Sequence, residues 1–138
     1  MIKEFKVFVS EEYKDRESAI FKMIRNGKLF GLTGADSINF DFKKHGSFQL
    51  DFKERGVIFG TFQEIIPDTR VSMIWNVNGF GRDDEKSTKV IISIVKVDDG
   101  TVLEINHTGI RNKVSANAKE RAWKEIVKEL KKELLLSA

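Results

Sequence analysis

The chain has 138 residues, of which 41% are hydrophobic and 33% charged, a composition typical of one folded domain rather than a disordered segment. Lys and Arg (24) exceed Asp and Glu (21) by three, and these charges are spread along the chain, which disfavours a nucleic-acid partner. The absence of cysteine excludes disulfides, thiolate metal sites and a cysteine nucleophile.

The N-terminal quarter predicts a strand followed by helical structure. Residues 2–10 alternate in hydrophobicity, as in a strand that packs on one face. From about residue 11 to 26, apolar side chains including Tyr13 recur at helical spacing, and an Asn-Gly pair supplies the helix stop. Residues 28–37 form either a short second helix or an irregular loop. We find no secretory leader and no run long enough to span a membrane, so we expect a cytoplasmic protein without membrane contact.

Alternation with a period of two dominates the middle of the chain. Six segments show it, and we expect six consecutive antiparallel strands at 38–42, 48–52, 57–66, 71–77, 88–97 and 101–108. His45-Gly46 and residues 98–100 are turn sequences between neighbouring strands. The polar segment 79–87 has no apolar anchor after Phe80, so we expect it to project into solvent.

The last predicted element is a long amphipathic helix. Asn117 and Glu120 fit an N-cap and its box partner. One face carries an apolar stripe of Ala122, Trp123, Ile126, Val127, Leu130 and Leu134. The opposite face mixes glutamate with lysine, which favours packing on a core over an interfacial membrane helix. Since this helix is the one element large enough to cover a long sheet, the sequence predicts an α+β fold with the antiparallel sheet curled around it.

Four blocks of sequence, in their order and spacing, resemble one known family. They are Gly46-Ser47-Phe48, the run from Gly60 to Val71 with Trp75, the run from Asp99 to Ile110, and Ala122-Trp123. Together they span most of the chain and resemble the START-like, helix-grip (Bet v 1-like or SRPBCC) superfamily, in the branch of activators of the heat-shock-90 ATPase and their homologues. The resemblance implies a single START-like domain over residues 1–138, with a curved sheet of about six to seven strands wrapped around the C-terminal helix.

A cavity between the helix and the concave sheet is the usual setting for a mostly apolar ligand pocket. The candidate lining residues are Phe48, Trp75, His107 and Trp123, with Phe30 and Phe80 as candidate loop gates. For the aromatic residues the competing interpretation is packing in the core. His107 shares strand parity with Leu103 and Ile105, so it points inward. It is then either a hydrogen-bonded core residue or a polar anchor for a ligand, with an imidazole that titrates near pKa 6.5.

Three functions agree with these features. The first is binding of an apolar, lipid-like small molecule in the cavity, without a cofactor. The family resemblance suggests a second, a co-chaperone that stimulates the heat-shock-90 ATPase, and a cyclase- or hydrolase-type enzyme with His107 as acid or base is the third.

Other functions lack a sequence signal. Two histidines about sixty residues apart define no metal site, and no nucleotide-binding or serine-nucleophile motif is present. The predicted strand 88–97 has apolar residues on both faces, which leaves open a homodimer through its outer surface.

Overall fold

The computed structural model describes residues 3–81 and 84–137. Its elements are, in chain order, β1 (Phe5–Tyr13), α1 (Glu17–Arg25), α2 (Lys28–Gly31), β2 (Ser37–Phe40), β3 (Ser47–Asp51), β4 (Val57–Ile66), β5 (Arg70–Asn78), β6 (Glu85–Val97), β7 (Gly100–Ile110) and α3 (Lys113–Ser137). The predicted order of a strand, helical structure, six strands and a long helix is therefore confirmed, and the segment 28–37 begins with the short helix α2.

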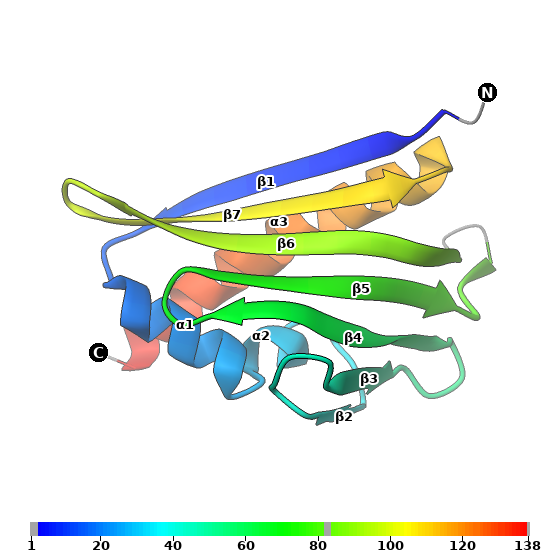
Figure 1. Ribbon diagram of the computed structural model, residues 1–138, viewed down its shortest axis with the longest axis horizontal. Coiled ribbons are helices and arrows are strands. Elements are labelled where there is room, and N and C mark those ends of the chain that lie inside the picture. The colour runs from blue at the N-terminus through cyan, green and yellow to red at the C-terminus, as the bar shows by residue number, and fades with distance from the viewer. Residues whose placement is uncertain (1–2, 82–83, 138) are drawn as a thin grey trace.

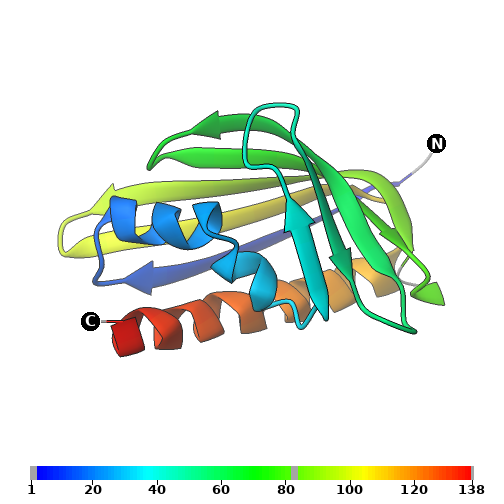
Figure 2. The same cartoon turned by 90° about the horizontal axis from the view of Figure 1, so that it is seen from below.

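The seven strands form one antiparallel sheet in the order β1-β7-β6-β5-β4-β3-β2. Strands β2 to β7 follow one another across the sheet because each is joined to the next by a short connection, and β1 pairs with the last strand, β7. The sheet curves, and α3 lies across its inner face, with α1 and α2 on the same side (Figures 1 and 2). The predicted α+β helix-grip architecture is confirmed.

The hydrophobic core fills the space between the inner face of the sheet and α3. Alternate strand residues point into it, as the period-two pattern predicts, and the helical stripe from Trp123 to Leu134 meets them. Gly60 of β4 stands opposite Trp75 of β5 in this core layer. A Cβ at that position would overlap the carbonyl oxygen of Ile74, so the close approach of the two strands requires glycine.

The predicted start of the first helix is wrong. Strand β1 continues through Tyr13, and α1 begins at Glu17. Tyr13 is buried at the inward parity of the strand, and its hydroxyl donates to the carbonyl oxygen of Val127 in α3 at 2.7 Å. Local helical spacing indicated a helix here, but this contact across 114 residues and the pairing of β1 with β7 favour the strand.

The predicted N-cap of the last helix is also wrong. Helix α3 begins at Lys113, one turn before Asn117. The side-chain oxygen of Asn112 accepts hydrogen bonds from the backbone N–H groups of Val114 (2.8 Å) and Ser115 (3.3 Å), so Asn112 caps the helix. Both residues are asparagine, and only the position where β7 ends decides between them.

The polar segment before β6 is shorter than predicted. Strand β6 begins at Glu85 rather than at residue 88, and residues 82–83 lie outside the part of the chain that the structure describes. Phe80 packs edge-on against Phe52 at 5.3 Å between ring centroids, so this aromatic residue turns toward the protein.

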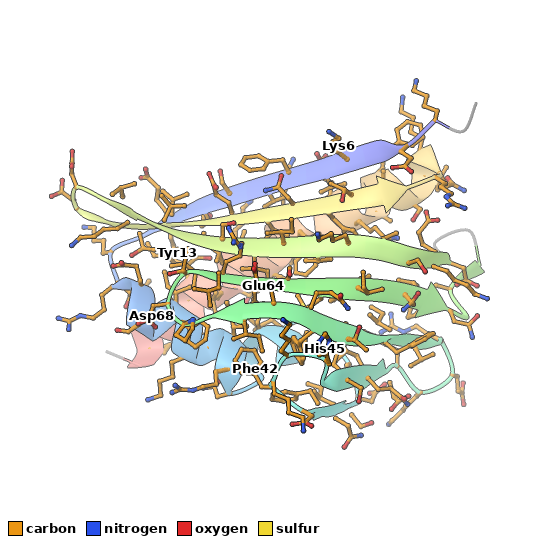
Figure 3. The ribbon with its side chains drawn as sticks, in the orientation of Figure 1. Lys6, Tyr13, Phe42, His45, Glu64 and Asp68 are labelled. Atoms are coloured by element: carbon orange, nitrogen blue, oxygen red, sulfur yellow. The ribbon has the colours of Figure 1, made fainter. Side chains whose placement is uncertain are left out.

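The outer face of the sheet, toward the viewer in Figure 3, is mainly polar. Glu64 on this face accepts a hydrogen bond from Arg70 Nε at 2.8 Å, and both side chains are half-buried. Phe8, Val95 and Val97 are exposed apolar residues of β1 and β6. The homodimer through the outer surface of β6 stays a prediction.

Candidate functional site

A pocket of about 300 Å³ lies beside the first half of α3. Its other walls come from β4, β5 and three connecting segments. The first segment follows α2, the second joins β3 to β4, and the third joins β5 to β6. The apolar part of the wall is formed mainly by Trp75, Val77, Phe80, Ala122, Trp123 and Ile126. Residues that lie far apart in the sequence thus meet here because the helix crosses the sheet at this end.

Two tryptophans form the inner wall of the pocket. Trp75 comes from β5 and Trp123 from α3, and their ring centroids are 5.3 Å apart at an angle of 50°. Both side chains are buried. They therefore separate the pocket from the core, and each contributes a small part of its apolar surface to the pocket wall.

Three charged side chains also line the pocket. Arg55, in the β3–β4 turn, and Glu125, on α3, are exposed. Lys119 of α3 is only 8% exposed, and its Nζ donates a hydrogen bond to Ser115 Oγ at 2.6 Å. The pocket therefore combines apolar walls with charged groups at a few positions, the composition typical of small-molecule sites.

Behind the tryptophans, a directed chain of hydrogen bonds holds His107. The Trp123 indole Nε1–H donates to His107 Nδ1 at 3.1 Å, and His107 Nε2 lies 2.8 Å from Thr88 Oγ1. The Thr88 hydroxyl in turn donates to the carbonyl oxygen of Trp75 at 2.7 Å. An indole nitrogen can only donate, so Nδ1 is the acceptor and the imidazole proton resides on Nε2.

This arrangement keeps His107 neutral. Protonation would place a hydrogen on Nδ1 that faces the indole N–H of Trp123. Desolvation in the buried site, with a smaller contribution from the Lys119 charge, lowers the pKa of His107 from 6.5 to about 3. The expectation that this imidazole titrates near 6.5 is therefore wrong, because both ring nitrogens are buried and engaged in the core.

The six predicted site residues separate into two groups. Trp75, Phe80 and Trp123 line the pocket. The other three are buried outside its lining, and they are Phe30, Phe48 and His107.

Phe30 belongs to α2 and stacks on Phe48 with ring centroids 5.2 Å apart, so it packs in the core where a loop gate was expected. The ring centroid of Phe48 lies 5.5 Å from that of Phe62 and 5.5 Å from that of Trp75. These rings fill the centre of the space between sheet and helix, and the pocket lies at the end beside Trp75.

Some lining residues were not predicted, and one of them had a sequence signal. Lys119 precedes Trp123 by four residues, a spacing that places both side chains on one face of a helix. The predicted helix began at Asn117 and so contained both residues, which means that the sequence alone could have placed Lys119 beside Trp123. Arg55 gave no comparable signal, because its position at the pocket depends on how the β3–β4 turn folds back.

The described residues contain no group of three or more His, Asp or Glu side chains placed to hold a metal ion. Among the helices in the described part of the chain, none is long and apolar enough to cross a membrane.

Comparison with known proteins places the chain in context. The family model described as Activator of Hsp90 ATPase homolog 1-like protein matches residues 20–134. No curated protein matches the chain in sequence.

Solved structures share the fold at low sequence identity. A crystal structure of a Mesorhizobium loti protein is 15% identical, covers 97% of this chain and 99% of its own, and has a TM-score of 0.85. An HSP90 activator from Plasmodium falciparum is 22% identical over 97% of this chain and 96% of its own, with a TM-score of 0.73. The Aha1 dimer from Colwellia psychrerythraea is 14% identical over 92% and 93%, with a TM-score of 0.74.

Proposed function

The chain belongs to the Activator of Hsp90 ATPase homolog 1-like family, and we propose that it binds a small, mostly apolar molecule in the pocket beside α3. The observation that carries this proposal is the pocket of about 300 Å³ whose inner wall is formed by Trp75 and Trp123. A space of this kind differs from ordinary packing gaps, because well-packed cores leave few voids larger than a water molecule.

The volume suggests the size of the ligand. An apolar cavity of about 150 Å³ holds one benzene ring. The volume of about 300 Å³ here therefore suits a molecule with about two fused rings or a medium-length alkyl chain. A whole membrane lipid would exceed it, so we expect small aromatic or aliphatic compounds.

The chain carries its own reporter of binding. It has two tryptophans, Trp75 and Trp123, and both line the pocket. A ligand that contacts them should change the intrinsic tryptophan fluorescence and raise the melting temperature, since a molecule that binds only the folded state stabilises it. We propose to test a panel of naphthalene derivatives, indoles and aliphatic compounds of about ten carbons by both methods.

A matched pair of helix variants makes the test specific. Ala122→Phe should fill the pocket and weaken binding about tenfold or more, whereas Lys128→Phe adds the same ring at an exposed position of α3 outside the pocket. Equal affinity of both variants, or no response of the unmodified protein to the whole panel, would count against a binding function for this pocket.

A second function, stimulation of the heat-shock-90 ATPase, is favoured by one observation. The HSP90 activator from Plasmodium falciparum aligns with this chain over 96% of its own length. A solved structure of about this length is therefore described as an HSP90 activator. The assay is the ATPase rate of the chaperone from the same organism with and without this protein. An unchanged rate at a large excess of the protein would exclude the activity.

A third function, acid or base catalysis by His107, has no geometric support. A general base must lie within hydrogen-bond reach of its substrate. His107 is fully buried behind the two tryptophans, and its nitrogens are bound to Thr88 and Trp123. We therefore assign His107 to the support of the pocket wall.

A further inference from the structure

The two edges of the sheet differ in length. The sheet ends in β2 on one side and in β1 on the other. β2 has four residues, whereas β1 has nine and contains neither proline nor glycine. Short edge strands are one means by which proteins prevent edge pairing, and a long edge strand presents a row of N–H and C=O groups that can pair with another chain. β1 is therefore the edge to which a further strand can be added.

The free edge of β1 is open and regular. In Figure 1, β1 forms the upper border of the molecule, and none of the other described helices and strands lies beyond it. The register shift between β1 and β7 sets one residue, Lys6, against two residues of β7, Thr108 and Gly109, so the irregularity belongs to β7. β1 itself alternates in exposure without interruption from Phe5 to Tyr13. Its backbone can therefore pair along the whole strand.

The inner side of β1 carries one charge, and that charge already has a partner. Inward-pointing charges are another means by which edge strands resist pairing. Glu11 has this inward parity, and its carboxylate lies 3.6 Å from Lys131 Nζ of α3. Because Glu11 is paired within its own chain, it does not prevent a strand from pairing beside it.

The outer side of β1 carries four exposed residues, Lys6, Phe8, Ser10 and Glu12. Phe8 is 52% exposed, and its neighbour on β7 is the polar residue Asn106. Figure 3 shows Lys6 at the free border of the sheet. Within the described part of the chain, neither Lys6 nor Glu12 belongs to an ion pair. The strand thus presents an exposed apolar ring between two opposite charges.

The order of these charges is self-complementary. Two copies of a strand that pair about a two-fold axis run antiparallel, and their inner faces stay on one side only if residues of equal parity stand opposite each other. A register centred on Val9 pairs all nine residues from Phe5 to Tyr13. It places Lys6 of each copy opposite Glu12 of the other. The two Phe8 residues become diagonal neighbours about 7–8 Å apart, a separation that aromatic side chains bridge.

The neighbouring registers bring like charges together. Moving the centre by one residue from Val9 sets Glu4 opposite Glu12 in one direction and Lys6 opposite Lys14 in the other. Like charges directly opposite each other destabilise a strand pair. The charges therefore select the same register that pairs the greatest length of strand.

We propose that β1 is the interface with a second copy of this chain. The two strands pair antiparallel about Val9 and join the two sheets into one, with Lys6–Glu12 pairs and both Phe8 rings on the outer face. Two paired strands of nine residues make a small interface, so we expect a dissociation constant of about 10–100 µM. β1 contributes no residue to the lining of the pocket beside α3, so this interface does not depend on the proposed ligand.

The test is the mass of the full chain in solution. Sedimentation velocity between about 5 µM and about 1 mM should show a change from mostly monomer to mostly dimer. A chain that stays monomeric at about 1 mM would overturn the proposal. Larger, open-ended assemblies would overturn it too, because an interface about a two-fold axis closes at two copies.

Charge reversals test the register. Lys6→Glu sets acidic residues opposite each other on both sides of the axis, and Glu12→Lys sets basic residues there, so each should raise the dissociation constant about tenfold. The double variant Lys6→Glu/Glu12→Lys restores opposite charges and should return the constant to within about threefold of the unmodified protein. If the double variant dimerises as weakly as the single variants, the register is wrong and the proposal fails.

A third substitution tests the apolar part of the interface. Phe8→Ala removes both rings beside the axis and should weaken the dimer about tenfold. Lys6, Phe8 and Glu12 are all exposed, so the melting temperature of each monomeric variant should stay close to that of the unmodified protein. Dimerisation that is unchanged in Phe8→Ala would contradict the proposed interface.

Two controls separate the edge from the rest of the outer face. Lys89→Glu makes the same charge change as Lys6→Glu at an exposed position of β6 and should leave the dissociation constant unchanged. Val95→Lys adds a charge to the outer face of β6, where the sequence also allowed a homodimer, and it should have no effect either. A dimer that Val95→Lys disrupts and Lys6→Glu does not would place the interface on β6 and overturn the assignment to β1.

Discussion

Neutral His107 predicts a core that is sensitive to acid. Burial, aided by the Lys119 charge, lowers the pKa of His107 from 6.5 to about 3 in the folded protein. In the unfolded chain the imidazole is hydrated and titrates near its usual value of 6.5. Below pH 6.5 the unfolded state therefore binds a proton that the folded state does not bind. The stability from this residue is complete above pH 6.5 and is lost progressively as the pH falls toward 3.

The magnitude follows from the same pKa difference. Each pH unit between the two pKa values corresponds to about 1.4 kcal/mol of folding free energy. A change from pH 7 to pH 5 crosses about 1.5 units of this window, so His107 should lower the free energy of unfolding by about 2 kcal/mol. Domains of this size are typically stable by about 5–15 kcal/mol, so a loss of this size is measurable.

The assay is urea denaturation at pH 5, 6 and 7 for the unmodified protein and for His107→Gln. The unmodified protein should lose about 2 kcal/mol more than the variant between pH 7 and pH 5. His45→Asn is the matched control, because His45 is exposed in a turn with φ of 68°, a conformation that asparagine adopts readily. The reasoning fails if His107→Gln and the unmodified protein show parallel pH dependence, or if nitrogen NMR detects a protonated His107 in the folded protein at pH 5.

Three further substitutions test the hydrogen bonds that join α3 to the sheet and cap it. Trp123→Phe removes the donor to His107 Nδ1, so it should destabilise the protein by about 2–4 kcal/mol and raise the histidine pKa, which NMR titration measures; an unchanged pKa contradicts the assigned tautomer. Tyr13→Phe removes the hydroxyl bound to Val127, and thermal unfolding should report a loss of about 1 kcal/mol; no loss would mean that water replaces the bond. Asn112→Ala should also lose about 1 kcal/mol in urea denaturation, whereas the same change at Asn117 should be nearly neutral; the reverse order would restore the cap predicted from sequence.

The sheet and the long helix could be predicted because each depends on a repeat that runs over many residues. Alternation in residues 38–108 marks which side chains face the core, and the structure buries Phe48, Leu50, Met73 and Trp75 as that pattern requires. The stripe from Trp123 to Leu134 does the same for α3. Such a repeat lies within the sequence of one element and does not depend on which elements pack beside it, so it can be identified from the sequence alone.

Boundaries and site membership depend on contacts that no local pattern contains. Tyr13 fits a helical face as well as a strand, and its bond to Val127 across 114 residues is what distinguishes the two. Phe30 and Phe80 look alike in sequence, since both lie in glycine-flanked segments. Only the packing of α2 on β3 places Phe30 in the core, while the β5–β6 connection carries Phe80 to the pocket.

The buried polar chain and the pocket belong to one arrangement. Trp75 and Trp123 form the pocket wall, and both are also joined through Thr88 and His107 on the side away from it. Because His107 accepts a hydrogen bond from the Trp123 indole, a ligand does not have to order this ring when it binds, and this reduces the entropy lost on association. The histidine is required to be neutral for this support, since only an unprotonated Nδ1 accepts the indole N–H. The low pKa of His107 follows from its burial behind this wall, and contact with a ligand falls to the parts of the two indoles that line the pocket.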